Sequence, residues 1–321
     1  MPDAAAGQAG CVAVPYCNPV YDGYLADPFV LRTAEGYVAV GTGGVVDGRF
    51  FQVLTSADLV HWTPAGGALE PLPTEQGNDY WAPEIAEHDG RWWLYYSIGN
   101  GDVGHRLRVA VAKSPTGPYV DCGVDLTPHE RFAIDPHPFC DRDGTWYLFY
   151  AHDVLEGDRV GTMLAVDVLT TMTSVAGTPR TILRPSGDWQ LFRRDREMYG
   201  GVYDWHTLEG PFVREQDGRY WCFYSGGSWE TDGYGVATAV ADHPLGPWSE
   251  SPDSPPLLAT VPGRVLGPGH NSVVTTREGR DVLVYHAWDP DLTARRMCID
   301  PLDWTPDGPT VDGPSWQLRT L

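Results

Sequence analysis

The chain has few basic residues, no long apolar stretch, and no basic segment followed by an apolar one at its start. Its 22 Lys and Arg residues stand against 43 Asp and Glu residues, so the formal net charge is −21. Such a chain repels phosphate backbones and anionic lipid surfaces, so neither nucleic acid nor a membrane is an expected partner. No stretch approaches the roughly 18 apolar residues of a membrane-spanning helix, and no secretion signal is visible. We therefore expect a cytoplasmic protein, or a secreted one if a leader has been removed.

The sequence also lacks the common metal-ligand spacings. None of the six cysteines belongs to a Cys-x-x-Cys pair, which argues against a zinc site of the finger type. The ten histidines show no His-x-x-x-His spacing, so a catalytic zinc is not expected. A disulfide between Cys11 and Cys17 is left open by the sequence.

Turn residues and aromatic residues, in contrast, are abundant. The 37 glycines and 28 prolines indicate many turns and short strands, and 13 Trp, 16 Tyr and 9 Phe are ample for a core. An acidic residue and a glycine followed by an aromatic or apolar strand recur five times, with the glycines at positions 36, 90, 144, 218 and 279. Each copy predicts a tight turn leading into a strand. Five repeats of roughly 50 to 70 residues predict an all-β fold, a five-bladed β-propeller.

No linker divides the repeats. We therefore expect a single domain over residues 1–321, with blades that start near residues 27, 82, 135, 209 and 270. The long spacing between the glycines at 144 and 218 predicts an insertion near Trp189 to Trp205, placed to close one end of a pocket.

Carboxylates stand at matching places in the segments before the turns. A proline precedes the turn glycine by seven or eight residues in four repeats, namely Pro28, Pro83, Pro136 and Pro211. Asp27, Asp135 and Glu209 lie at or near these points, and the fifth repeat has His270. The first strand of each propeller blade lines the central channel, so these groups should converge. Neighbouring carboxylates raise one another's pKa, and glycoside hydrolysis needs both a protonated acid and an ionised carboxylate.

These segments together resemble glycoside hydrolase family 43, from about residue 18 to residue 309. The resemblance lies in Ala26-Asp27-Pro28, Trp81-Ala82-Pro83-Glu84, Ile134-Asp135-Pro136, Glu209-Gly210-Pro211, Gly267-Pro268-Gly269-His270-Asn271, Arg295-Arg296-Met297 and Ile299-Asp300-Pro301-Leu302. Each motif is short, but their order and spacing match a propeller of this family.

The resemblance implies a role for each carboxylate. Asp27 would be the general base that activates water, and Glu209 the general acid that protonates the departing oxygen. Asp135 would adjust the pKa of the acid and orient the substrate. The family inverts the anomeric configuration in one displacement. No cofactor is required, but some members hold an ion, often calcium, beside the histidine equivalent to His270. Calcium prefers oxygen ligands, so His270 would reach it through a coordinated water.

Other residues are candidates for sugar binding. Trp81, Tyr80 and Trp205 could each stack an aromatic ring on a sugar face, or belong to the core. Arg295 could reach sugar hydroxyls, as the last-blade arginine of the family does. Arg296 is adjacent, and strand alternation lets only one of the two point inward.

The sequence therefore predicts an inverting exo-glycosidase that acts on terminal pentose linkages of small oligosaccharides. An α-L-arabinofuranosidase is the first choice, and a β-D-xylosidase or an arabinanase with the same mechanism are alternatives. A retaining fructosidase is disfavoured, because Ile134 and Gly210 are not the neighbours that those enzymes carry. A non-catalytic sugar-binding propeller is the alternative from another class. The sequence leaves the oligomeric state open.

Overall fold

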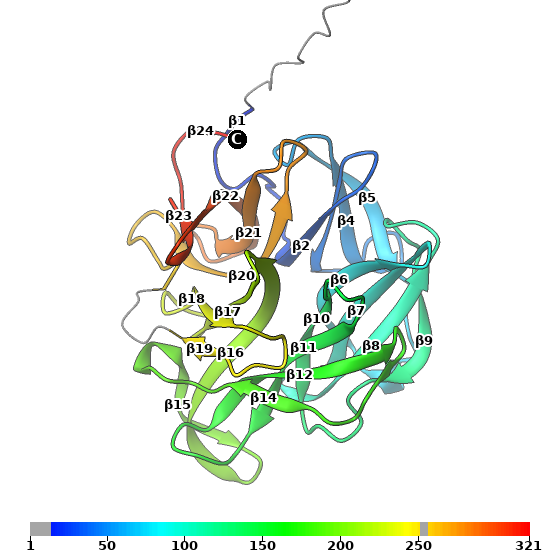
Figure 1. The fold of residues 1–321 in the computed structure, drawn as a ribbon, viewed down its shortest axis with the longest axis vertical. Helices are drawn as coiled ribbons and strands as arrows, with labels where there is room; N and C mark the ends of the chain where they lie inside the picture. Colours follow the sequence, from blue (N-terminus) through cyan, green and yellow to red (C-terminus); the bar gives the residue numbers. More distant parts are fainter. Residues whose placement is uncertain (1–13, 251–255) are drawn as a thin grey trace, which may run out of the picture.

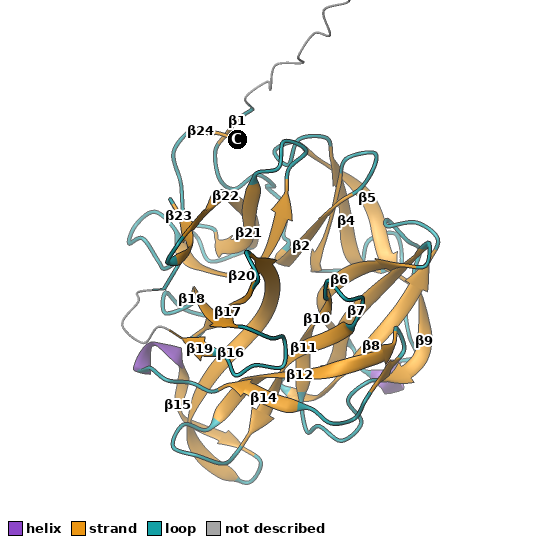
Figure 2. Ribbon diagram, in the orientation of Figure 1, coloured by secondary structure: helices purple, strands orange, loops and turns teal. Residues whose placement is uncertain are grey.

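The computed structural model describes residues 14–250 and 256–321, and its elements are almost all β-strands. Five antiparallel blades surround a centre, and the first strands of the blades, β2, β6, β10, β16 and β20, lie nearest to it (Figure 1). The two helical segments in the described ranges, η1 (Thr74–Gln76) and η2 (Asp188–Gln190), are single short turns at the periphery (Figure 2). The predicted all-β, five-bladed propeller is confirmed.

The first two blades are regular four-stranded sheets. The first blade consists of β2 (Ala26–Arg32), β3 (Tyr37–Thr42), β4 (Phe50–Ser56) and β5 (Trp62–Leu69). The second blade consists of β6 (Asp79–His88), β7 (Arg91–Asn100), β8 (Val103–Ala112) and β9 (Val120–Asp125).

The third and fourth blades are joined into one larger sheet by a short parallel pairing of β12 with β16. The third contains β10 (Ala133–Cys140), β11 (Trp146–Val154), β12 (Gly161–Thr171), β13 (Ser174–Val175) and β14 (Arg180–Leu183). The fourth contains β15 (Leu191–Met198), β16 (Gly201–Gln216), β17 (Arg219–Gly226), β18 (Gly235–Ala241) and β19 (Ser249–Glu250). The fifth contains β20 (Leu266–Thr275), β21 (Asp281–Trp288), β22 (Arg295–Thr305) and β23 (Gly308–Val311).

The core lies between the faces of neighbouring blades. The second strand of each blade contributes apolar side chains with no exposed surface, among them Val40, Leu94, Phe149, Phe223 and Leu283. These are the strands that the sequence marks by a turn glycine followed by aromatic and apolar residues. Burial of both faces of a blade explains why these strands are nearly continuous apolar runs rather than alternating ones.

The start and the end of the described chain are held together on the fifth blade. Strand β1 (Pro15–Tyr16) pairs with β24 (Arg319–Thr320), and the two strands lie side by side at one edge in Figure 1. The side chain of Asn18 donates to the carbonyl of Ile299 at 2.8 Å and accepts from its N–H at 2.9 Å. The segment that precedes the first blade is thereby held to the last blade. The pairing of Cys11 with Cys17, which the sequence leaves open, lies outside the described residues, because Cys11 precedes residue 14.

A buried carboxylate strengthens this connection. Asp300 in β22 has no exposed surface and accepts hydrogen bonds from the Tyr16 hydroxyl at 3.4 Å and the Tyr285 hydroxyl at 2.8 Å. The backbone N–H of Ser315 donates to it at 3.0 Å. One side chain therefore links β1, β21 and the segment that leads to β24.

Candidate active site

The inner strands share a bulge that shapes the centre of the molecule. In each of them two residues oppose one residue of the second strand. The first bulge residue has a positive φ in every blade: Asp27 (51°), Ala82 (46°), Asp135 (60°), Gly210 (58°) and His270 (47°). A left-handed conformation costs a residue other than glycine roughly 1–2 kcal/mol, and such strain is commonly found at functional sites.

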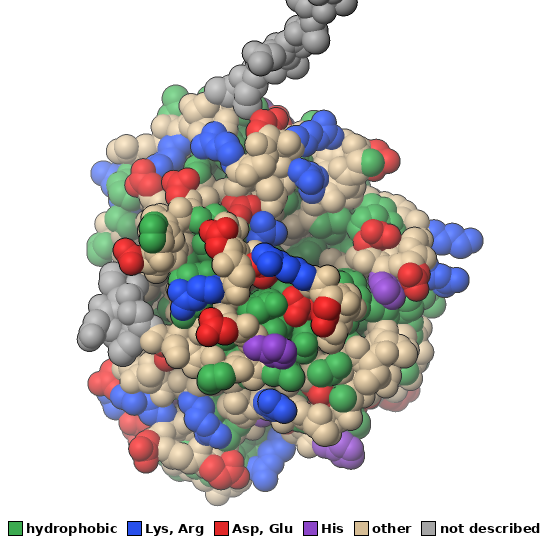
Figure 3. Space-filling model, in the orientation of Figure 1, with side chains coloured by type: hydrophobic (Ala, Val, Ile, Leu, Met, Phe, Trp, Pro, Cys, Tyr) green, Lys and Arg blue, Asp and Glu red, His purple; other side chains and the backbone are tan. Residues whose placement is uncertain are grey.

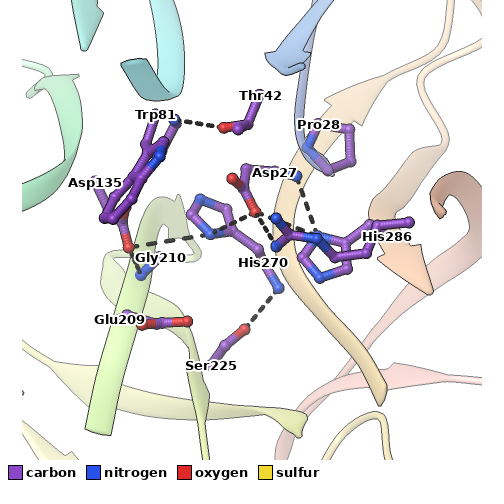
Figure 4. Close-up of polar contacts among 12 residues, drawn as sticks. Asp27, Pro28, Thr42, Trp81, Asp135, Glu209, Gly210, Ser225, His270 and His286 are labelled. Atoms are coloured by element: carbon purple, nitrogen blue, oxygen red, sulfur yellow. Dashed lines mark hydrogen bonds and ion pairs between the residues drawn. The ribbon is translucent and has the colours of Figure 1, made fainter. Parts of the chain in front are cut away.

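Side chains of the preceding blade hold these bulges in place. The bulge N–H donates to an acceptor on the second strand of that blade, in the pairs Asp27–His286 (3.1 Å), Ala82–Thr42 (2.8 Å), Asp135–Ser97 (3.2 Å) and His270–Ser225 (2.7 Å). Figure 4 shows three of these contacts, those to His286, Thr42 and Ser225. The third blade has Ala151 at the equivalent position, which offers no acceptor. The N–H of Gly210 instead donates to Oδ2 of Asp135 at 2.8 Å.

A pocket of about 130 Å³ is lined by residues from all five blades. Asp27, Asp135 and Glu209 all line it, so the structure brings the three predicted carboxylates together. The face shown in Figure 3 has acidic, basic and histidine side chains gathered near its middle. Sites for drug-sized ligands span about 300–1,000 Å³, so this pocket suits a single sugar unit better than a length of polymer.

Asp27 lies in a setting that favours its charged form. Its Oδ1 is 3.4 Å from Nδ1 of His270 and 3.3 Å from a terminal nitrogen of Arg295. Burial by itself would raise the pKa of Asp27, but His270 and Arg295 hold it well below its usual value. Burial also lowers the pKa of His270, so Arg295 is the permanent positive charge beside this carboxylate near neutral pH. Asp27 is therefore an ionised acceptor.

Glu209 lies in a setting that favours its protonated form. It immediately precedes the bulge of its strand, so its register matches Trp81 and Ile134 rather than the two aspartates. Burial is the main cause that raises its pKa to about 7, and the charge of Asp27 adds to this. The hydroxyl of Tyr234 donates to Oε1 at 2.6 Å and opposes the rise. Two carboxyl groups of one pocket thus differ in protonation state.

Asp135 lies near both of these groups and is held by the backbone. Its Oδ2 accepts the Gly210 N–H and is 4.0 Å from Nδ1 of His270. Figure 4 shows Asp135 and Asp27 on opposite sides of His270. Burial and the charges of Glu209 and Asp27 raise the pKa of Asp135 well above its usual value. Since the Gly210 N–H follows Glu209 directly, Asp135 fixes the backbone from which Glu209 extends.

The surroundings of His270 do not form a calcium site made of protein groups. Calcium takes six to eight oxygen ligands. In residues 14–250 and 256–321, no three His, Cys, Asp or Glu side chains are grouped so that they could hold a metal ion. His270 instead faces the carboxylates of Asp27 and Asp135. A calcium ion held through coordinated water stays a prediction, and no step proposed below uses a metal.

The sequence offers four sugar-binding candidates with an aromatic ring or a guanidinium group. Two of them, Trp81 and Arg295, reach the pocket. The Trp81 ring lines the pocket and stacks on His105 with ring centroids 3.8 Å apart. Arg295 also lines it, and its guanidinium carbon lies 4.6 Å from the centre of the Trp229 ring. Arg296 points away and pairs with Asp289 at 3.1 Å, so strand alternation selects Arg295 as the inward arginine.

The other two, Tyr80 and Trp205, do not line the pocket. Tyr80 is buried in the core, where its ring stacks on Phe50 with centroids 3.7 Å apart. It precedes Trp81 in an extended strand, and alternation therefore places it on the opposite face. Trp205 has no exposed surface and donates from its indole nitrogen to Thr162 at 3.3 Å. The structure thus places both side chains in the core, the alternative to sugar stacking that the sequence left open, and this corrects their prediction as sugar-binding residues.

Several lining residues were not identified from the sequence. The insertion predicted near Trp189 to Trp205 is a hairpin formed by β15 and the start of β16, and it contributes Phe192, Arg196 and Met198. Asp102 and Asp153 line the pocket from loops or strand ends of other blades. The spacing of the turn glycines revealed the hairpin, but no sequence signal indicated which of its side chains turn inward.

Comparison with known proteins identifies the family of this pocket. Residues 16–310 match the family described as glycosyl hydrolases family 43. The protein belongs to glycoside hydrolase family 43. A solved structure of a thermostable family 43 glycoside hydrolase is similar, with a TM-score of 0.81 and 30% identity, covering 94% of this chain and 97% of that one.

Two curated relatives show the range of activities near this family 43 enzyme. A β-D-galactofuranosidase of Aspergillus niger is 29% identical over 307 residues, covering 88% of this chain and 80% of the relative. An extracellular exo-α-(1→5)-L-arabinofuranosidase of Streptomyces avermitilis is 26% identical over 338 residues, covering 94% of this chain but only 65% of the relative. The enzyme therefore hydrolyses glycosides, and its substrate is a carbohydrate. The expected cytoplasmic location gains no support, because the Streptomyces relative is named as extracellular. None of the helices in the described ranges is long and apolar enough to cross a membrane.

Proposed function

We propose that this family 43 enzyme is an inverting exo-glycosidase that releases terminal α-L-arabinofuranosyl units from short oligosaccharides. The Streptomyces relative is named for hydrolysis of an α-L-arabinofuranosyl linkage, and the Aspergillus relative for another furanoside. The small volume of the pocket supports exo action, because a polymer that continued in both directions would need a longer groove.

The different surroundings of Asp27 and Glu209 carry the proposal: Asp27 lies beside Arg295 and His270, whereas Glu209 is buried and bonded to the Tyr234 hydroxyl. General acid–base catalysis needs one group that takes a proton and one that gives it at the same pH. The pKa of Asp27 is held well below its usual value, whereas that of Glu209 is raised to about 7. At slightly acidic pH, Asp27 is ionised and most of Glu209 is protonated.

The reaction follows from these two states. Asp27 removes a proton from a water molecule, whose oxygen attacks the anomeric carbon of the bound sugar. The bond from that carbon to the leaving oxygen breaks, and Glu209 transfers its proton to this oxygen. The released sugar has the inverted configuration. Proton loss from Asp27 and proton uptake by Glu209 then restore the starting state.

Neighbouring residues orient the substrate in this scheme. Asp135 holds the backbone behind Glu209 through the Gly210 N–H and keeps the acid at a fixed place. The Trp81 indole offers an apolar face to one side of the sugar ring, and the Arg295 guanidinium offers donors to its hydroxyls. A β-D-xylosidase or an arabinanase would use the same carboxylates, so the substrate is decided by assay.

The test is hydrolysis of three aryl glycosides: an α-L-arabinofuranoside, a β-D-xyloside and a β-D-galactofuranoside. We expect the arabinofuranoside to have the highest kcat/KM. The anomer that forms first, followed by proton NMR, should be the inverted one. Preference for another sugar would change the substrate, and a first product with retained configuration would overturn the single-displacement scheme.

A further inference from the structure

The hairpin formed by β15 and the first residues of β16 is fixed against two other blades. Arg196 in this hairpin pairs with Asp102, at the turn between β7 and β8 of the second blade, at 2.7 Å. The hydroxyl of Tyr199 donates to Asp153 of the third blade at 2.7 Å. The guanidinium carbon of Arg131 lies 5.6 Å from the centre of the Tyr199 ring. These contacts hold the hairpin against the second and third blades, where it forms one wall of the pocket.

Arg196 is the basic side chain that this wall presents to the pocket. Its guanidinium carbon lies 4.9 Å from the centre of the Phe192 ring and 5.0 Å from that of the Trp205 ring. Only 12% of the side chain is exposed. Trp205 is itself fixed by its bond to Thr162. A planar guanidinium stacked on two aromatic rings is preorganised, so little rotamer freedom is left to lose when it binds a ligand.

Most of the hydrogen-bonding capacity of Arg196 is unused by the protein. A guanidinium has five N–H donors. Within residues 14–250 and 256–321, its hydrogen bond to a protein acceptor is the one from a terminal nitrogen to Asp102. Arg194, on the same strand, differs: it pairs with Asp204 at 3.0 Å, but its side chain is 71% exposed and does not line the pocket. A nearly buried arginine with free donors at a pocket is suited to bind acceptor oxygens of a ligand.

The charge of the pocket restricts what those oxygens are. Two arginines, Arg196 and Arg295, line it together with five carboxyl groups: Asp27, Asp102, Asp135, Asp153 and Glu209. A carboxylate or phosphate ligand would be repelled by those of the five carboxyl groups that are ionised, Asp27 first among them, so anionic sugars are disfavoured. Hydroxyl oxygens of a neutral sugar accept hydrogen bonds without this repulsion.

We propose that Arg196 is a substrate-binding residue that donates hydrogen bonds to hydroxyl oxygens of a neutral terminal sugar. Asp102, Phe192 and Trp205 position it, and the hairpin that carries it limits the pocket to one sugar unit. The limit to one unit rests on the proposed exo-glycosidase activity. The contact of Arg196 with sugar hydroxyls holds for any neutral glycoside that the enzyme hydrolyses.

The test compares Arg196→Ala with Arg194→Ala as the matched control. Both variants remove an ion-paired arginine from the same hairpin, but only Arg196 lines the pocket. On whichever aryl glycoside the native enzyme hydrolyses best, we expect Arg196→Ala to raise KM at least tenfold. The acidic and alkaline limbs of the pH–rate profile should not shift, because Arg196 neither gives nor takes a proton. Arg194→Ala should match the native enzyme in both readouts. An unchanged KM in a folded Arg196→Ala variant would overturn the inference.

A second variant and a binding measurement test the role of Arg196 independently of Arg196→Ala. If Arg196→Ala does not fold, Arg196→Lys retains the charge and the apolar stem but loses the planar fork, and KM should still rise severalfold. An Arg196→Lys variant with native KM would overturn the role of the guanidinium. Titration with free L-arabinose, D-xylose and D-galactose, followed by tryptophan fluorescence, reports on the pocket through Trp81 and Trp229.

These measurements separate the two proposals. Turnover of a xyloside or galactofuranoside alone would change the proposed substrate, while the KM comparison would still decide the role of Arg196. Sugar binding without any turnover would remove the proposed catalytic function, and weaker binding by Arg196→Ala would still support the contact. If the native protein neither binds nor hydrolyses any of these sugars, both proposals fail.

Discussion

The hydroxyl of Tyr234 donates a 2.6 Å hydrogen bond to Oε1 of Glu209. Tyr234 is 1% exposed, and its ring stacks on His286 with ring centroids 5.8 Å apart. His286 in turn accepts the backbone N–H of Asp27. One buried tyrosine thus packs between the supports of the proposed acid and the proposed base, and it fixes their relative position.

Loss of the Tyr234 hydroxyl should move the pH dependence of the reaction. A donated hydrogen bond stabilises the ionised form of Glu209, so Tyr234→Phe raises the pKa of this acid above about 7. The acid works when protonated, and activity falls as pH rises through its pKa. We expect the alkaline limb of kcat/KM to shift to higher pH, with the acidic limb unchanged. Unmoved limbs in a full pH–rate profile would show that this hydrogen bond does not tune the acid.

Substitution of the two proposed catalytic carboxyl groups should have different consequences for different leaving groups. Glu209→Gln should lower kcat/KM by about 10²–10⁴-fold on an oligosaccharide, and less on an aryl glycoside with an activated leaving group. Asp27→Asn should lower kcat/KM by the same factor on both substrates, because water must be activated in either case. Parallel kinetics of the two variants on both substrates check this. Equal losses for Glu209→Gln on both would argue against its role as the acid.

A methyl group at Gly269 should disturb the site without touching a carboxylate. A Cβ added at Gly269 would lie 2.0 Å from Cε1 of Tyr234, which cannot retreat because it is buried. We expect Gly269→Ala to displace Tyr234 and lower kcat at least tenfold. Gly44→Ala is the control, since a Cβ there meets nothing within 4 Å. Native kinetics in Gly269→Ala would mean that the ring position is not needed.

Replacement of the carboxylate that joins the termini should lower stability but leave the chemistry intact. Asp300→Asn puts an amide among three donors, those of Tyr16, Tyr285 and Ser315, and leaves at least one of them without an acceptor. The expected cost is about 1–3 kcal/mol in the free energy of unfolding. In urea unfolding, Asp300→Asn should have a lower midpoint than Asp303→Asn, which changes an exposed residue on the same strand. Equal midpoints would contradict the role of Asp300.

The outline of the site could be predicted because its signals are local. Asp27 and Asp135 each stand directly before a proline at matching places in the repeat, so equivalence in the fold follows from spacing alone. Glu209 stands one residue earlier relative to its proline, and the structure gives it the register of Trp81. The spacing of the turn glycines likewise predicted an insertion where the hairpin lies, but it did not indicate which side chains of the hairpin line the pocket.

The rest depends on contacts that one sequence does not display. Tyr80 and Trp81 are both aromatic and adjacent, and only the packing of Tyr80 against Phe50 decides which of them enters the core. Arg196 follows Asp195, whose φ of 49° marks an irregular stretch of β15 where simple alternation fails. Tyr234 lies far along the chain from Glu209 and meets it only through the folding of the fourth blade.

The repeated bulge has a consequence for how such a protein changes its chemistry over time. In most blades the backbone at the bulge is held by a neighbour's side chain, and the bulge side chain takes no part in that support. Asp, Ala and His occupy the same conformation there, so a reacting group can be exchanged while the scaffold stays unchanged. The third blade differs, because Ala151 offers no side-chain acceptor and the Gly210 N–H donates to Asp135 instead. At Asp135 one side chain serves the backbone support as well as the proposed reaction, so a substitution there must be accompanied by a new acceptor at position 151.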